Sequence, residues 1–104
     1  MMKEVKAYIR PELVDHVVDV LGLIPGLGGI AVVPVNDYGH VFDDRGLKRT
    51  RMIKLEIDAP DDEVETVIRA ILDNGRTGEG HPGDGSVLVI DVASAYRIAD
   101  GSSL

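Results

Sequence analysis

The chain has 104 residues, 18 acidic against 11 basic side chains and a formal net charge of −7, and at this length we expect one domain, residues 1–104, with a single modest core. The acidic balance argues against a DNA or RNA partner, and the absence of cysteine excludes disulfides, thiolate metal sites and a cysteine nucleophile. No apolar run approaches the ~20 residues of a membrane span, and the first residues lack the apolar core of a signal peptide, so we expect a cytoplasmic protein.

The chain begins with a strand and a helix. Residues 3–10 alternate apolar with polar side chains, which is the period-two pattern of a strand with one solvated face. Pro11 ends that strand and suits the first turn of a helix. Within residues 12–21 the apolar side chains recur at helical spacing, which predicts an amphipathic helix.

A second strand and a long polar stretch follow a glycine-rich turn. Residues 30–35 are apolar on both alternating faces. Pro34 cannot donate a ladder hydrogen bond, so we expect it at an edge, a bulge or a strand end. Residues 36–50 are polar without a convincing period, which predicts a loop. Their glycine and charge content predicts that this loop is mobile without a ligand.

The second half of the chain repeats the first. Residues 53–58 alternate and predict a third strand. Asp61 and Asp62 predict a helix start with a carboxylate cap and acidic residues in the positive first turn, followed by an apolar stripe. Residues 87–92 predict a fourth strand, and residues 94–98 a short addition before the polar tail.

This order of elements predicts an α+β fold of the ferredoxin-like β-α-β-β-α-β class. Right-handed crossovers fold such a pair of units into an antiparallel four-stranded sheet with both helices on one face. The other face is left uncovered, and we expect it to be apolar because the second and fourth strands are apolar on both sides. Large exposed apolar patches normally mean association, so the pattern predicts an oligomer.

The stretch from Arg76 to Ser86 is the most informative part of the chain for function. It holds four glycines and a proline and runs straight into the fourth strand. Glycine lets a ligand approach the bare backbone, so the N–H groups of such a loop can face an anion. The alternative interpretation is a plain turn, in which Asp84 bonds only nearby backbone.

In combination, these residues resemble the PII signal-transduction proteins and their PII-like relatives. The motifs that carry the resemblance cover nearly the whole chain: Met2 to Pro11, Gly29 to Val32, Tyr38-Gly39, Lys54 to Ile57, Pro60 to Asp62, Thr77-Gly78, Gly83-Asp84-Gly85 and Arg97-Ile98. The resemblance implies a homotrimer with nucleotide sites in the clefts between neighbouring subunits. It also implies a partner-binding T-loop at about residues 37–50, a phosphate-wrapping B-loop at about residues 75–86, and a C-terminal segment that closes the cleft of the adjacent subunit.

By position, the resemblance supplies a set of nucleotide-binding residues and no catalytic ones. The set is Gly39, His40, Thr77, Gly83, Asp84, Gly85, Ser86 and Arg97. No resident cofactor is required, and the implied ligand is an adenine nucleotide.

Several positions depart from the family pattern. Ser86, Ala99 and His40 stand where basic residues are usual, and Val41 replaces a glutamine that helps to hold Mg-ATP and 2-oxoglutarate. Each lost cation removes about 1–3 kcal/mol of charge-assisted phosphate contact. We therefore expect ADP or AMP to be favoured over ATP with 2-oxoglutarate. The T-loop is also shorter than usual, and the B-loop is longer by residues 80–82.

The sequence thus predicts a regulatory protein that is not an enzyme and that controls a transporter or an enzyme through its T-loop. Three alternatives stay open. The first is a small anion or a divalent metal ion bound between the two loops, with His40, His81, Asp43 and Asp44 as the candidate metal ligands. A small nucleotide hydrolase would use His40 or His81 with Asp43. A degenerate site would leave only a scaffold.

Overall fold

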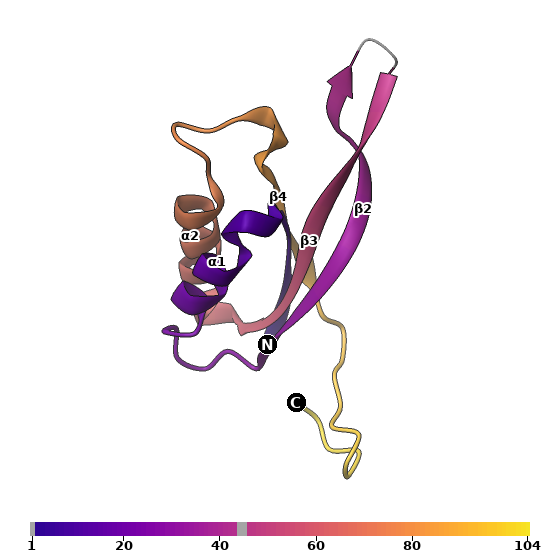
Figure 1. Ribbon diagram of the computed structural model, residues 1–104. Coiled ribbons are helices and arrows are strands. Elements are labelled where there is room, and N and C mark those ends of the chain that lie inside the picture. The colour runs from indigo at the N-terminus through magenta and orange to yellow at the C-terminus, as the bar shows by residue number, and fades with distance from the viewer. Residues whose placement is uncertain (1, 44–45) are drawn as a thin grey trace.

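The computed structural model describes residues 2–43 and 46–104 and places a four-stranded antiparallel sheet under one layer of helices (Figure 1). The elements run in this order: β1 Met2–Ile9, η1 Pro11–Leu13, α1 Val14–Leu21, β2 Gly29–Asp43, β3 Gly46–Pro60, η2 Asp61–Glu63, α2 Val64–Gly75, η3 Pro82–Asp84 and β4 Gly85–Asp91. The strand order is β2-β3-β1-β4. This confirms the ferredoxin-like prediction, and it puts Pro34 in an edge strand, where its missing N–H is tolerated.

The core lies between the helices and the sheet and is built from two similar halves. Each helix begins as a short 3₁₀ turn, η1 or η2, and continues as an α-helix. Its fully or nearly buried side chains recur at one spacing: Val14, Val17 and Leu21 in α1, and Val64, Val67 and Ile71 in α2. They pack on apolar side chains of the two central strands, namely Val5, Ala7, Ile9, Leu55, Ile57 and Ala59.

The start of the second helix differs from the expected carboxylate cap. The N-cap residue is Pro60, which offers no side-chain acceptor, and no side-chain cap hydrogen bond forms there. Proline fixes the extended φ that leads into the turn. Asp61, Asp62 and Glu63 do occupy the first turn, where carboxylates are favoured by the helix dipole.

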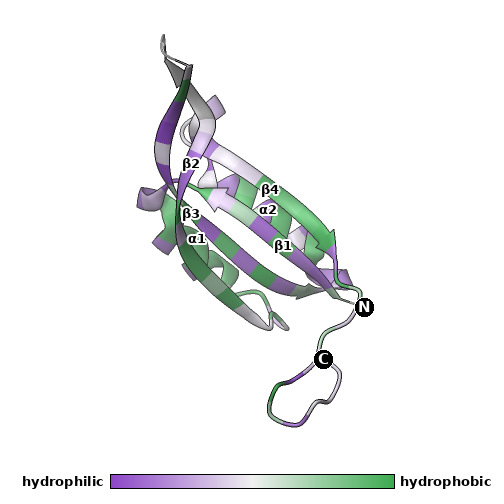
Figure 2. Cartoon of the chain, turned by 90° about the vertical axis from the view of Figure 1, so that its right-hand side faces the viewer, coloured by the Kyte–Doolittle hydropathy of each residue, from purple (hydrophilic) through white to green (hydrophobic). Residues whose placement is uncertain are grey.

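The uncovered face of the sheet is less apolar than expected. The edge strand β4 contributes Leu88 and Ile90, both exposed, in agreement with the prediction. The central strands β1 and β3, however, carry an alternating row of polar and charged residues, which appears as purple bands in Figure 2. Lys6 and Glu56 are directly opposite each other in the ladder, and the Lys54 Nζ lies 3.1 Å from a Glu56 carboxylate oxygen. The face therefore has an apolar rim and a charged centre.

The polar stretch after residue 35 is the main correction to the predicted fold. In the described residues it is not a loop: β2 and β3 continue as a two-stranded hairpin that projects beyond the helices (Figure 1). Asp37 pairs with Thr50 and Tyr38 with Arg49, and the register shifts between Tyr38 and Val41. Backbone ladder bonds can form whatever the side-chain polarity, so the hairpin needs no apolar period. Asp44 lies outside the described residues.

The C-terminal segment after β4 folds back on itself. The Arg97 N–H donates to the Ser102 carbonyl at 2.8 Å, and the Leu104 N–H donates to the Ala95 carbonyl at 2.9 Å. The expected short addition is thus a turn closed by an isolated bridge between Tyr96 and Ser103. Figure 1 shows this segment, in yellow, extending away from the sheet at the end opposite the hairpin.

Candidate functional site

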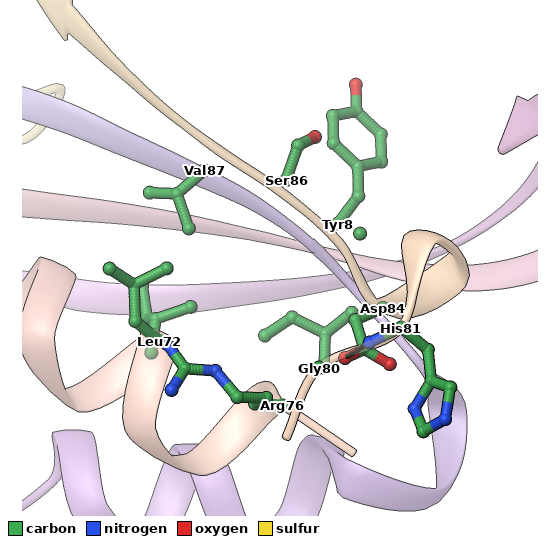
Figure 3. A pocket seen from close by; sticks show the side chains of 12 residues that line it. Tyr8, Leu72, Arg76, Gly80, His81, Asp84, Ser86 and Val87 are labelled. Atoms are coloured by element: carbon green, nitrogen blue, oxygen red, sulfur yellow. Dashed lines mark hydrogen bonds between the residues drawn. The ribbon is translucent and has the colours of Figure 1, made fainter. Parts of the chain in front are cut away.

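The glycine-rich loop borders a pocket of about 280 Å³ where α2 ends and the edge strand β4 begins. Ile71, Leu72 and Gly75 contribute an apolar wall from α2. Polar groups come from Tyr8, Arg76, His81, Asp84 and Ser86. In Figure 3, Tyr8 and Ser86 point to one side of the β4 ribbon, and Arg76 and His81 lie on the other.

Asp84 organises the loop through its carboxylate. Its oxygens accept hydrogen bonds from the backbone N–H of Thr77 at 3.0 Å and of His81 at 2.9 Å. The Thr77 hydroxyl donates to the same carboxylate at 2.5 Å, and the Arg10 Nε donates to it at 2.9 Å. One side chain therefore ties together the two ends of the loop and the end of β1.

The electrostatics of Asp84 follow from these contacts. Desolvation by partial burial acts to raise the pKa of Asp84, but the hydrogen bonds from Thr77, His81 and Arg10 outweigh it and hold the pKa well below its ordinary value. The side chain is only 16% exposed. Asp84 is thus a permanent anion whose charge is already matched by donors of the loop.

His81 is held in a defined orientation by Thr77. Its Nδ1 lies 2.7 Å from the Thr77 hydroxyl oxygen and 3.0 Å from the Thr77 carbonyl oxygen. Because the Thr77 hydroxyl gives its proton to Asp84, both groups can only accept from His81. The proton is therefore assigned to Nδ1, and Nε2 is left for a ligand or solvent.

Gly85 is required where the loop enters β4. Its φ is +115°, and a Cβ added there would lie 1.8 Å from the Tyr8 carbonyl oxygen. No other residue fits without moving β1 away from β4. Directly after it, Ser86 pairs with Tyr8 across the ladder.

The structure brings most of the predicted site residues together. Thr77, Asp84, Gly85 and Ser86 lie in or beside the pocket, and Gly83 is buried in the η3 turn. Gly39 has a φ of +107° and lies at the register shift of the hairpin, while β2 contacts η3. The strand that carries Gly39 therefore contacts the glycine-rich loop within one chain.

Other predicted residues are not brought to this pocket within one chain. Arg97 belongs to the turn of the C-terminal segment, and that segment extends away from the sheet at the end opposite the hairpin (Figure 1). The side chain of His40 lies outside the described part of the chain, so its role stays a prediction. Within the residues that the structure describes, no group of three or more His, Asp or Glu side chains is gathered as for a metal ion.

Sequence reasoning did not identify three residues of this site: Tyr8, Arg10 and Arg76. Arg10 follows β1, and Asp84 precedes β4. Because these neighbouring strands are antiparallel, the end of β1 meets the start of β4, and the observed strand order brings Arg10 to Asp84.

Comparison with known proteins identifies the family. A family model described as nitrogen regulatory protein P-II matches residues 2–102. The chain belongs to the P-II family. Nitrogen regulatory protein P-II 1 of Escherichia coli K12 is 33% identical, with 96% of this chain and 94% of the relative covered. The P-II protein of Haemophilus influenzae is 32% identical over the same shares.

A solved structure supports the same assignment. The crystal structure of Arabidopsis thaliana PII bound to citrate superposes with a TM-score of 0.78 at 33% identity, covering 98% of this chain and 84% of that one. The P-II assignment confirms the resemblance inferred from the sequence.

None of the helices in the described residues has the length and apolar character needed to span a membrane.

Proposed function

We propose that this P-II chain is a homotrimeric regulatory sensor, without enzymatic activity, whose effector is an adenine nucleotide bound beside the Asp84-braced loop. The observation that carries the proposal is the loop itself. Its Asp84 carboxylate is turned inward onto Arg10, Thr77 and His81, which fixes a glycine-rich backbone at the mouth of a pocket. Such a preordered backbone suits an anionic group.

The proposed preference is for ADP or AMP over ATP. Ser86 stands where the family resemblance expects a basic residue, and Arg76 is the cationic side chain that lines the pocket in the described chain. Arg10 is committed to Asp84. Fewer cations favour fewer phosphates, because each charge-assisted contact contributes about 1.5–3 kcal/mol.

Isothermal titration with ATP, ADP and AMP, each with and without 2-oxoglutarate, tests this preference. Ser86→Lys adds a cation at the position where the family resemblance expects one and should tighten ATP about tenfold, which corresponds to about 1.4 kcal/mol. His16→Lys adds the same charge at an exposed position of α1, outside the pocket, and should change ATP affinity less than about twofold. Micromolar ATP binding to the unaltered protein, strengthened by 2-oxoglutarate, would contradict the proposal.

A small organic anion is the second candidate effector. The observation that favours it is the relative from Arabidopsis thaliana, which was crystallised with citrate. Citrate belongs in the same titration panel, together with Zn²⁺ and Mg²⁺ for the metal-binding alternative. The hydrolase alternative predicts rapid nucleotide turnover that is lost in His40→Ala or His81→Ala, and the sensor predicts none.

The proposed output is the β2–β3 hairpin, acting on a transporter or an enzyme. Gly39 gives the hairpin a bend close to the loop, so an occupied pocket can bias which hairpin conformations are populated. Hydrogen exchange of residues 37–50 should change when the preferred effector binds.

Light scattering at micromolar concentration checks the proposed trimer, and a monomeric mass would contradict it.

A further inference from the structure

The helix layer, defined here as residues 11–21 and 61–75, concentrates the negative charge of the molecule. It holds eight carboxylates, those of Glu12, Asp15, Asp19, Asp61, Asp62, Glu63, Glu65 and Asp73, against one cationic side chain, Arg69. The rest of the chain has ten acidic and ten basic residues. The formal charge of −7 therefore belongs entirely to this layer, which covers the side of the sheet opposite the uncovered face (Figures 1 and 2).

An apolar groove runs along this charged layer between the end of α1 and α2. It has a volume of about 610 Å³. Val20, Ile24 and Ala70 form its apolar floor, and Leu23 at its margin is 83% exposed. An exposed leucine alone would need no explanation, but one that continues an open apolar groove extends the surface that a partner can cover.

The rim of the groove carries exposed acidic side chains that another molecule can reach. Glu65 and Asp73 lie along it on α2. The Arg69 guanidinium lies 3.8 Å from Asp73, with the two side chains 64% and 56% exposed. Such an exposed pair contributes little to stability, so Asp73 can exchange Arg69 for a cation of another molecule at small cost.

We propose that this groove docks a basic amphipathic segment of a partner protein, such as a short helix that covers Leu23 with apolar side chains and meets Glu65 and Asp73 with Lys or Arg. An apolar floor, with a rim that carries Glu65 and Asp73 against the single cation Arg69, suits a helix-in-groove interaction with a basic helix. The surrounding charge steers cationic partners and repels both nucleic acid and anionic lipid.

A second copy of the chain is the competing occupant. The hairpin carries Lys48, Arg49 and Arg51 with the 61% exposed Leu47, so it has matching chemistry. Docking a hairpin tip into a distant helix groove is a head-to-tail contact, which builds open chains unless the rotation closes. A separate partner meets the same groove without that consequence, and we therefore assign the groove to a partner.

The experiment uses the full-length protein and two fluorescein-labelled 14-residue amphipathic peptides, one of Leu and Lys and one of Leu and Glu. Fluorescence anisotropy at 150 mM salt should show saturable binding of the Leu/Lys peptide to the protein and no binding of the Leu/Glu peptide. Leu23→Gln combined with Glu65→Gln should weaken it at least tenfold. Glu12→Gln combined with Asp62→Asn removes two carboxylates from the same layer, one more than the groove variant, but outside the groove, and should weaken the peptide by no more than threefold.

Several results would overturn the assignment. Equal loss of binding in the groove variant and in its control would mean general charge attraction and no groove. Binding of the Leu/Glu peptide as tightly as the Leu/Lys peptide, or no binding of either, would also reject it. Sedimentation of the protein alone supplies the remaining outcome: association beyond the trimer that the groove variant abolishes would make a second copy the occupant. All changed side chains are exposed or partly exposed, and thermal unfolding confirms that the variants fold.

Discussion

The two loops that follow the helices occupy corresponding places in the two halves of the fold, yet they are built differently. The first, residues 22–28, is closed by backbone bonds such as Ile24 N–H to the Leu21 carbonyl at 3.0 Å and Gly28 N–H to the Asp58 carbonyl at 3.1 Å. The second, residues 76–84, is organised by the Asp84 carboxylate, which collects donors from Thr77, His81 and Arg10.

The difference shows where the fold has room for function. Backbone bonds close the first loop without help from its side chains, so Leu23 and Ile24 are left to line the groove beside α2. The second loop also contains turn bonds, from the Gly80 N–H to the Thr77 carbonyl and from the Asp84 N–H to the His81 carbonyl, but the partly buried Asp84 carboxylate is what ties it to Arg10 at the end of β1. Only the second loop borders the pocket beside β4. The comparison therefore predicts that the two loops respond unequally to matched substitutions.

The largest inequality is expected at the glycines that begin β2 and β4, Gly29 and Gly85. A Cβ at Gly85 meets the Tyr8 carbonyl oxygen at 1.8 Å, whereas a Cβ at Gly29 meets nothing within 4 Å. Gly85→Ala should lower the free energy of unfolding by at least about 3 kcal/mol or prevent folding. Gly29→Ala should be neutral or stabilise by about 0.4–1 kcal/mol, because it restricts the unfolded chain.

Urea denaturation of the two variants measures this difference. Equal stability of Gly85→Ala and Gly29→Ala would show that β1 and β4 can separate at Tyr8 without cost. In that case the second loop would not be fixed to the sheet in the way the geometry requires.

The next effect concerns Asp84, the brace of the second loop. Asp84→Asn keeps the size of the side chain but turns an NH₂ group toward groups that donate, and it should cost about 2–3 kcal/mol at pH 7. The folded-state pKa of Asp84 is depressed, so its stabilising contribution is present above the unfolded pKa of about 3.9 and is lost as pH falls toward the folded pKa. The difference in free energy of unfolding between the unaltered protein and Asp84→Asn should therefore be constant above about pH 5 and narrow below about pH 4.

Asp100→Asn is the matched control for that measurement. The pKa of Asp100 is also lowered, through hydrogen bonds from Ser102, but this side chain lies in an exposed turn of the C-terminal segment. Its replacement should leave the stability of the body unchanged at every pH. A gap of the same size for both variants would mean that local turn chemistry, and not bracing of the loop, explains Asp84.

How far the sequence predicts these features depends on the kind of signal each one leaves. The helices and the central strands have apolar side chains at regular spacing in the sequence, and their positions could be predicted from that spacing. The hairpin arms were missed because ladder bonds hold Asp37 opposite Thr50 without any apolar period. The loop was located by its glycines, but the inward direction of Asp84 depends on Arg10, a contact across 74 positions that only the strand order creates.

A smaller effect is expected at Thr77, which links Asp84 to His81. Thr77→Val keeps the shape but removes the hydroxyl that donates to Asp84 and accepts from His81, and it should cost about 1.5–2 kcal/mol. Thr77→Ser keeps the hydroxyl and should recover most of that loss. If Thr77→Ser is as unstable as Thr77→Val, the methyl group and not the hydrogen bonds carries the effect.

The smallest effect is expected in the first loop, at Gly26. Its φ is +80°, but the nearest atom to an added Cβ is Pro60 Cγ at 3.7 Å, so Gly26→Ala meets backbone strain without a clash. The cost should be about 1 kcal/mol. Since this loop does not border the pocket, nucleotide affinity measured by titration should stay unchanged in Gly26→Ala, while Asp84→Asn should weaken it severalfold by loosening the braced loop. Loss of affinity in Gly26→Ala would show that strain in one loop reaches the other through β3 and β1, and the two loops would then have to be treated as one coupled unit.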